Sequence, residues 1–445
     1  MNWGKLLNSE RIRKSERITE NDPRNEFESD FGRVIFSPAT RRMHDKTQVM
    51  PLSADDNIHT RLTHSMEVMT IGYSLGIKLI ENPKFKEISK IDNNLLDSRI
   101  IPMILKSAGL VHDIGNPPFG HFGEECIKNY FTSYFDSNKL TLSDTQMKDF
   151  THFDGNAQGF RILTKLQILD DIYGLNLTKS TLSSYLKYPN TDDINKSFIH
   201  KKKRGVFQPE KDYLLDVANS CGLINSNDEI IRHPLSYLVE ASDSLCYRIM
   251  DLEDGYNKGW YSINELKDIF GNNSVGKILR SIEGGNDTTI IVKFRIALMN
   301  KLTSHIITNF IDNYHDITQG KYNNELLEDN SDIDSILDDF CNDHIFPNRD
   351  ILSLELTGNS VIQGLLDLYT NYIFSENSKY RNRALGMISS SIIRTIKMEN
   401  KIDCEKWFEK FTDYDKLRMI VDYISGMTDQ FALNHYQKLN GQKII

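Results

Sequence analysis

The stretch Ala108-Gly-Leu-Val-His112-Asp113-Ile-Gly-Asn-Pro-Pro118 decides both the fold and the chemistry of this 445-residue chain. It closes an apolar run that begins at Ile100, and the pattern predicts a helix over residues 100–111. Gly115 and the two prolines end that helix, because neither residue type continues it readily. The His112-Asp113 doublet is therefore expected on the last turn, at the mouth of a core rather than inside it.

A second helix is predicted over residues 61–80. Its apolar positions recur at helical spacing, and His64 is placed at the edge of the stripe that they form, which consists of Leu62, Met66, Met69, Tyr73 and Ile77. A histidine on such a helix is by itself more often structural than functional. His64 becomes a candidate functional residue only because the sequence also contains the His112-Asp113 doublet.

A third helix is predicted over residues 235–254, preceded by Pro234 and followed by Gly255 as its stop. Asp243, Tyr247 and Asp251 stand at i, i+4 and i+8, so they project from one face of this apolar helix. Such a stripe either faces solvent or lines a pocket, and the surrounding hydrophobicity favours the pocket. Two imidazoles and two carboxylates would form a ligand set suited to Mn²⁺, Fe²⁺, Zn²⁺ or Mg²⁺.

Helical periodicity dominates the remaining chain and convincing alternating strands are scarce, which predicts an all-α fold. The composition, with 39% hydrophobic and 26% charged residues, is that of an ordinary globular protein. Neither a secretion signal nor an apolar run long enough for a membrane span is expected. Five scattered cysteines read as reduced thiols of a cytoplasmic protein.

The formal charge of −9 argues against a protein that coats nucleic acid over its whole surface. A polyanionic substrate would need a local cationic pocket, and Lys187 with the basic run Lys201-Lys202-Lys203-Arg204 could supply it. The alternative is that this run is merely a solvated loop.

Several longer motifs carry a resemblance to a known family. They are Asp45-Lys-Thr-Gln-Val49, Thr60-Arg-Leu-Thr-His-Ser-Met-Glu-Val68, His112 through Glu124, Phe153-Asp-Gly-Asn-Ala-Gln-Gly159, Glu240-Ala-Ser-Asp243 and Asp422-Tyr-Ile-Ser-Gly-Met-Thr-Asp429. Together they resemble the deoxyguanosine triphosphate triphosphohydrolases among the HD-domain metal-dependent phosphohydrolases. The matches run from about Phe27 to Tyr436, nearly the whole chain.

The resemblance implies an HD-domain helical bundle with additional C-terminal helices. We expect an N-terminal arm over residues 1–30, a catalytic core over 31–270, and a C-terminal helical region over 271–445 that completes the nucleotide pocket and the oligomer contacts. Relatives are often ring-like, which implies a homo-oligomer, with a hexamer as one form. Single-stranded DNA or a deoxynucleotide is implied as an effector.

The implied reaction is metal-dependent hydrolysis of dGTP to deoxyguanosine and inorganic triphosphate. His64, His112, Asp113 and Asp243 would bind one divalent metal, Mn²⁺ or Mg²⁺ first, with Fe²⁺, Zn²⁺ or Ni²⁺ as alternatives. His121 would protonate the leaving 5′-oxygen, and Glu124, three residues later at a helix start, would fix its tautomer. The competing interpretation is that both residues only stabilise that helix N-terminus.

The resemblance also assigns the nucleotide contacts. Arg61, Lys187 and Lys203 would hold the triphosphate and Asn156 would touch the nucleotide; Gln48 and Asp251 would bind the 3′-hydroxyl. Tyr247 would exclude a 2′-hydroxyl, and Glu355 and Arg383 would read guanine. The match around the last two is looser, the segment 374–389 lacks some expected basic residues, and His44 stands where glutamine is common.

Alternatives remain at the level of sequence. Within enzymes these are a broad-specificity deoxynucleoside triphosphate triphosphohydrolase, then a nucleotide phosphatase or cyclic-nucleotide phosphodiesterase on the same scaffold. From a different class comes a nucleic-acid-binding or sensor protein with a degenerate metal site. The presence of His121, Glu124 and all four ligand candidates argues against the last.

Overall fold

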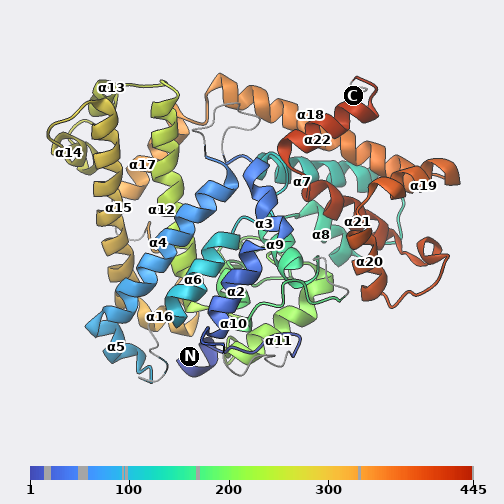
Figure 1. Ribbon diagram of the computed structural model, residues 1–445, viewed down its shortest axis with the longest axis horizontal. Helices are drawn as coiled ribbons and strands as arrows, with labels where there is room; N and C mark the ends of the chain where they lie inside the picture. Colours follow the sequence, from blue (N-terminus) through green and yellow to red (C-terminus); the bar gives the residue numbers. More distant parts are fainter. Residues whose placement is uncertain are drawn as a thin grey trace.

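The computed structural model describes residues 1–14, 22–48, 59–92, 95, 99–166, 171–328 and 332–442 (Figure 1). Within these ranges the regular structure is helical, and extended segments pair only in three isolated bridges. The all-α fold class is thus confirmed. None of the helices in the described ranges is long and apolar enough to cross a membrane.

The centre of the molecule is built from α4 (Arg61–Glu81), α6 (Ile100–Val111) and α12 (Pro234–Asn257), and α6 has the bounds that the sequence predicts. The helices α4 and α6 pack closely because glycines face the contact. A Cβ at Gly76 would lie 2.8 Å from the Cα of Pro102, and one at Gly72 would lie 3.2 Å from the carbonyl oxygen of Leu105.

This close contact overturns the predicted orientation of α4. The buried face runs through His64, Val68, Gly72 and Leu75, whereas Met66 is 48% exposed. Hydrophobicity alone predicted that the stripe with Met66 and Met69 is buried. Gly72 and Gly76 instead bring the face that contains His64 against α6. His64 therefore lies within the buried face of α4 rather than at the edge of an apolar stripe.

The predicted stop of α12 at Gly255 is also wrong, since the helix continues to Asn257. Gly255 is needed for packing rather than for termination, because a Cβ there would lie 2.4 Å from the hydroxyl of Tyr261. The turn that follows has its left-handed residue at Gly259, with φ of 72°.

One hydrophobic cluster joins the central helices to the chain N-terminus and to the helices at the left of Figure 1. Helices that contribute much of the rest of it are α1 (Trp3–Leu6), α5 (Pro83–Ser89), α13 (Ile263–Phe270), α14 (Ser274–Arg280), α15 (Asp287–Asp312), α16 (Tyr314–Gln319) and α17 (Asp332–His344).

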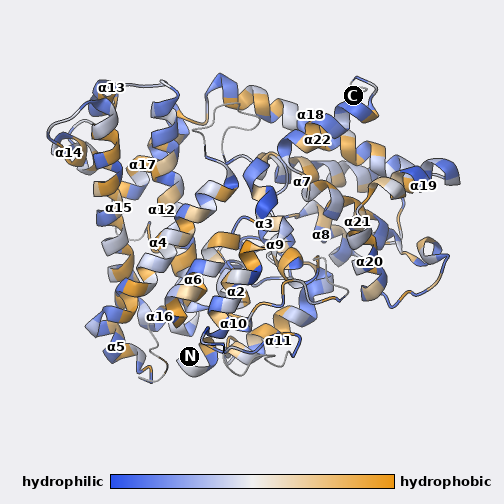
Figure 2. Ribbon diagram, viewed as in Figure 1, coloured by the Kyte–Doolittle hydropathy of each residue, from blue (hydrophilic) through white to orange (hydrophobic). Residues whose placement is uncertain are grey.

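A second cluster lies at the right of Figure 1 and contains the C-terminal helices. Its helices are α7 (Gly120–Ser137), α8 (Asp144–Thr151), α18 (Arg349–Ile373), α19 (Ser378–Met387), α20 (Ser390–Glu399), α21 (Asp413–Ser425) and α22 (Asp429–Leu439). Figure 2 shows that α19 is predominantly polar, in keeping with its place at the outer edge.

A third, smaller cluster completes the hydrophobic core of the described residues. It draws on α2 (Glu26–Ile35), α3 (Pro38–Arg42), α9 (Gly155–Thr164), α10 (Lys179–Tyr185) and α11 (Lys211–Cys221). Arg161 of α9 is fully buried and pairs with Glu210, Glu399 and Asp422 at 2.7 to 2.9 Å, which ties the third cluster to the second.

Candidate active site

Four candidate metal ligands converge from three helices. His64 lies on the first turn of α4, His112 caps the C-terminus of α6 and Asp113 follows it, and Asp243 lies in the middle of α12. The ligand atoms of His64, His112 and Asp113 lie within 4.8 Å of one another. The Oδ1 atom of Asp243 lies 3.1 Å from Nε2 of His64 and 3.3 Å from Nε2 of His112.

The arrangement fits a divalent cation on its own chemistry. His112 donates from Nδ1 to the carbonyl oxygen of Gly109 at 2.8 Å, which leaves its Nε2 atom available to coordinate a metal. That Nε2 is buried, and although it lies 3.3 Å from Oδ1 of Asp243 it makes no hydrogen bond of good geometry. A buried polar atom without a partner is costly, so an orphaned imidazole nitrogen beside two carboxylates suits a cation.

The charged groups of this cluster shift one another's pKa values strongly. Burial lowers the pKa of His112, but the carboxylates of Asp113 and Asp243 outweigh burial and raise it to about 9, so a metal bound at Nε2 would take the place of a proton there. Burial raises the pKa of Asp113, but Arg61 and His112 outweigh it and hold that pKa well below its usual range. The carboxylates are therefore charged at neutral pH, as metal ligands must be.

His121 and Glu124 form a pair beside this cluster, at the start of α7. His121 Nδ1 lies 3.3 Å from Oε2 of Glu124, and the other oxygen of Glu124 accepts from the backbone N–H of Gly155 at 2.8 Å. The imidazole is 70% exposed, whereas the carboxylate is almost completely buried. Burial raises the pKa of Glu124, but His121 and then Lys203 outweigh it and lower it to about 2. A fixed, ionised carboxylate thus orients an accessible imidazole.

Asp429 and Lys46, to which the sequence analysis assigned no role, hold the loop that leads into α7. Phe119 and Gly120 both adopt positive φ, at 62° and 59°. The carboxylate of Asp429, at the start of α22, accepts from the N–H of Phe119 and from the N–H of Thr47, each at 3.0 Å. Lys46 is buried and donates to the carbonyl oxygens of Asn116 and Ser425. Lys46 and Asp429 lie in two of the motifs that carry the family resemblance, and nothing else in the sequence pointed to their roles.

The three candidates for triphosphate binding are each paired with a carboxylate. Arg61 is buried and forms an ion pair with Asp113. Lys187 lies 3.1 Å from Glu240, and Lys203 lies 3.0 Å from Asp154, the residue that also accepts from the side chain of Asn156.

The other members of the basic run do not form a merely solvated loop. Lys201 pairs with Glu229, Lys202 with Glu325, and Arg204, which is 1% exposed, with Asp149.

The stripe on α12 runs from the metal ligands into the protein. Tyr247 stacks on Phe346 with ring centroids 6.1 Å apart and an interplanar angle of 24°. Asp251 is 3% exposed, and burial together with Asp254 raises its pKa well above the usual range. One oxygen of Asp251 and the side-chain oxygen of Gln48 are buried and have no hydrogen-bond partner.

The two candidates for base recognition lie on C-terminal helices. Glu355 is half-buried on α18, where burial and then Glu125 raise its pKa. Arg383 is exposed on α19, at the opposite end of the molecule from α12 (Figure 1). Within this chain the structure therefore does not bring Arg383 to the candidate metal ligands.

Comparison with known proteins gives consistent relatives. Residues 365–438 match the family described as "Phosphohydrolase-associated domain". A "Deoxyguanosinetriphosphate triphosphohydrolase-like protein" of Listeria monocytogenes is 34% identical over 99% of this chain and 100% of its own length. A protein of Synechocystis with the same name is 32% identical over 99% of both chains. A "Deoxyguanosinetriphosphate triphosphohydrolase" of Yersinia enterocolitica is 31% identical over 93% of both. With such identity over nearly its full length, the chain belongs to the deoxyguanosinetriphosphate triphosphohydrolase family.

Proposed function

We propose that this protein hydrolyses dGTP to deoxyguanosine and inorganic triphosphate, and that the reaction depends on a divalent metal. The observation that carries the proposal is the cluster of His64, His112, Asp113 and Asp243, with the His121–Glu124 pair beside it. The name of the Yersinia relative, a deoxyguanosinetriphosphate triphosphohydrolase, supports the choice of substrate.

The four ligand candidates would hold Mn²⁺ or Mg²⁺ first, with Fe²⁺, Zn²⁺ or Ni²⁺ as alternatives. A divalent cation held there supplies Lewis-acid stabilisation of phosphoryl charge and a water of lowered pKa. The Gly109 carbonyl and the Asn116 amide, which donates to Asp113 at 2.8 Å, orient two of the ligands for it.

His121 would act as the general acid. Water attacks the α-phosphorus, the bond from phosphorus to the 5′-oxygen breaks, and His121 gives its proton to that oxygen as deoxyguanosine leaves. The exposure of the imidazole allows contact with substrate, and the buried Glu124 carboxylate fixes Nδ1 as a donor. Nε2 is thereby directed away from Glu124 and toward the substrate.

Arg61, Lys187, Lys203 and Asn156 would surround the triphosphate. Each basic group already has a carboxylate partner, so the protein positions it before substrate arrives. Lysine has three donor hydrogens, and Lys187 and Lys203 keep 23% and 35% of their side chains exposed, which leaves donors for phosphate oxygens.

The sugar would lie along α12 over Tyr247. The buried side-chain oxygen of Gln48 can accept from the 3′-hydroxyl, and the carboxyl of Asp251, which its raised pKa keeps protonated, can donate to it. Tyr247 follows Asp243 by one helical turn and precedes Asp251 by one turn, so a ribose that spans the metal ligands and Asp251 must cross its ring.

Replacement of Tyr247 by alanine should narrow the preference for dGTP over GTP. A 2′-hydroxyl over the ring loses water without gaining a partner, at a cost of about 1–3 kcal/mol, or roughly 5- to 150-fold in kcat/KM. Tyr247→Phe keeps the ring and should keep the preference. The ratio of kcat/KM for the two nucleotides measures the effect, and an unchanged ratio in Tyr247→Ala would place the ribose elsewhere.

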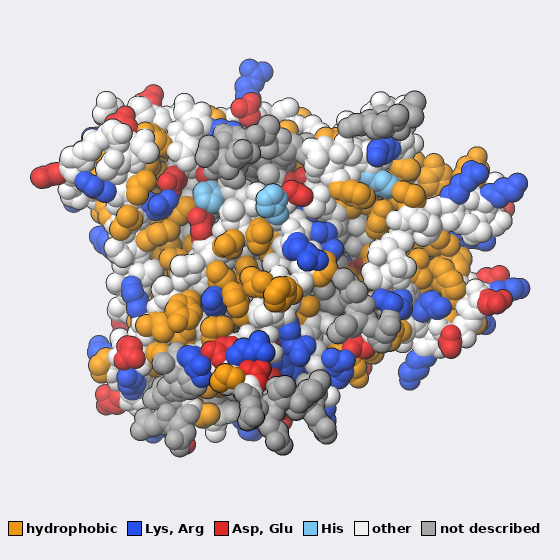
Figure 3. Space-filling view, viewed as in Figure 1, with side chains coloured by type: hydrophobic (Ala, Val, Ile, Leu, Met, Phe, Trp, Pro, Cys, Tyr) orange, Lys and Arg blue, Asp and Glu red, His pale blue; other side chains and the backbone are white. Residues whose placement is uncertain are grey.

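A broad-specificity deoxynucleoside triphosphate triphosphohydrolase is the second candidate. The exposed position of Arg383, far from the metal ligands within one protomer, favours it, because Glu355 alone would then face the base. In a homo-oligomer, which we also propose, Arg383 could be supplied to a neighbouring site. Exposed apolar side chains support such an assembly: Figure 3 shows hydrophobic residues across the middle of one face, and Phe36 is 80% exposed.

Incubation of the protein with each deoxynucleoside and ribonucleoside triphosphate, with Mn²⁺ or Mg²⁺, tests these assignments. We expect inorganic triphosphate and deoxyguanosine in a single step, detected by anion-exchange chromatography. Pyrophosphate with a nucleoside monophosphate, or stepwise loss of phosphate, would move the protein to another class of phosphohydrolase. Equal rates with all four deoxynucleotides would select the broad-specificity alternative. Repeating the assay with single-stranded DNA or a second deoxynucleotide would reveal an effector.

A further inference from the structure

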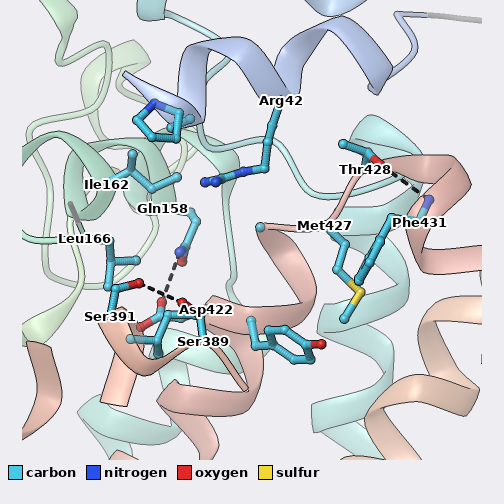
Figure 4. Close-up of a pocket in the computed structure, with 15 residues that line it drawn as sticks. Arg42, Gln158, Ile162, Leu166, Ser389, Ser391, Asp422, Met427, Thr428 and Phe431 are labelled. Carbon is cyan, nitrogen blue, oxygen red and sulfur yellow. Dashed lines mark hydrogen bonds between the residues drawn. The ribbon is translucent and has the colours of Figure 1, made fainter. Parts of the chain in front are cut away.

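A cavity of about 430 Å³ lies apart from the metal ligands, between α3, α9 and the C-terminal helices α20 to α22. Figure 4 shows it with Arg42 on one side, Gln158, Ile162 and Leu166 on another, and Met427 and Phe431 opposite. Its size is that of a small-molecule site rather than of a protein interface. None of its lining residues belongs to the metal, proton-transfer or nucleotide contacts proposed above.

Arg42 is the unusual member of this cavity. Its side chain extends over the open space, and none of the described residues forms an ion pair or a hydrogen bond with its guanidinium (Figure 4). Arg42 is exposed at the edge of the cavity, and the surrounding protein atoms, together with the neighbouring Arg41, lower its pKa. Although Arg42 is exposed to solvent, its guanidinium has no carboxylate partner among the described residues of the cavity, and its planar set of donors can pair with an anion there.

The carboxylate in the cavity wall is already engaged elsewhere. Asp422 accepts from Nε2 of Gln158 at 2.9 Å and from Nε of Arg161 at 2.9 Å. Arg161 also pairs with Glu210 and Glu399, so this buried network satisfies its own charges. The charge of Arg42 is therefore left without compensation in the cavity.

The remaining walls define the rest of the ligand. Ile162, Leu166 and Met427 present apolar surface, and Phe431 is 50% exposed at the rim. Ser389 and Ser391, whose hydroxyls lie 2.8 Å apart, add hydrogen-bonding groups at one end. Apolar walls with a few polar groups and one cation match a ligand that has a flat apolar body and one anionic group.

We propose that this cavity binds a small organic anion, whose phosphate or carboxylate pairs with Arg42 and whose apolar body lies between Ile162 and Met427. The proposal concerns a site separate from catalysis and does not rest on the proposed reaction. The phosphate ester and the carboxylate share the same chemistry at Arg42, and the probes below distinguish them.

Three probes with one ring system test the site: 1-naphthyl phosphate, 1-naphthoate and neutral 1-naphthol. Isothermal titration of the full chain without added metal should show that one or both anions bind, and that 1-naphthol binds at least about tenfold more weakly. The tighter of the two anions identifies the ligand class. Absence of binding by both anions, or equal binding of 1-naphthol, would overturn the proposal.

Two adjacent arginines provide the matched variants. Arg42→Gln should weaken binding of the anions by about tenfold or more, since a charge-assisted contact is lost. Arg41→Gln removes the same charge from an exposed side chain that does not line the cavity, and should leave binding within about twofold. Arg42→Lys should restore part of the affinity. Both positions are exposed, so thermal unfolding should be unchanged. Equal effects of Arg42→Gln and Arg41→Gln would assign the binding to general surface charge and overturn the site.

Discussion

Replacement of His112 by alanine should remove the bound divalent metal and lower turnover by several orders of magnitude. His112 offers a buried Nε2 whose orientation is set by the Gly109 carbonyl. Loss of one of four ligands disturbs the geometry of the others, and the Lewis-acid contribution of the metal is lost with it. Elemental analysis after dialysis and the rate of triphosphate release measure the two effects.

His315→Ala provides the control for this prediction. His315 is exposed on α16, far from the cluster, so its loss should change neither metal content nor rate. Circular dichroism should show that both variants remain helical. Near-normal turnover in a His112→Ala protein that contains no metal would disprove the assignment of the ligand set.

The parts of this site that could be predicted are those encoded locally. The apolar run before His112 defined α6 to the residue, because its composition and the Gly/Pro stop act within a few positions. The i, i+4 spacing of Asp243 and Tyr247 placed them on one face of α12 regardless of tertiary contacts. The motifs then supplied the expectation that separate helices meet at one point.

What could not be predicted depends on contacts between distant segments. The buried face of α4 is set by the approach of Gly72 and Gly76 to α6, and neither glycine contributes to a hydrophobic stripe. Asp429 binds the N–H groups of Thr47 and Phe119, which lie more than 300 residues earlier. No local pattern indicates such a partner, and the cavity at Arg42 likewise exists only because α3 meets the C-terminal helices.

Replacement of His121 by alanine should preserve metal content and nucleotide affinity but lower kcat by about 10²- to 10⁴-fold, the usual contribution of a positioned acid. The side chain is 70% exposed and contacts only Glu124 among the described side chains, so its removal should cost little stability. Single-turnover rates, with metal analysis and titration of a non-hydrolysable dGTP analogue, separate the chemical step from binding. If His121→Ala instead loses its metal, the residue is a ligand and the proposed roles are wrong.

Glu124 and its neighbour Glu125 allow a more specific test of how His121 is oriented. Glu124→Gln can keep the Gly155 contact through its amide oxygen, but it then presents an N–H₂ group to Nδ1 of His121, where the carboxylate accepted a hydrogen bond. The imidazole is pushed toward the neutral tautomer with its proton on Nε2, so kcat should fall by less than in His121→Ala and the pH profile should shift. Glu125→Gln removes the same charge one residue later, from an exposed side chain, and should leave the profile in place. A shift of equal size in both variants would mean that Glu124 acts only as a nearby charge, because orientation of the imidazole requires the specific contact that Glu124 alone makes.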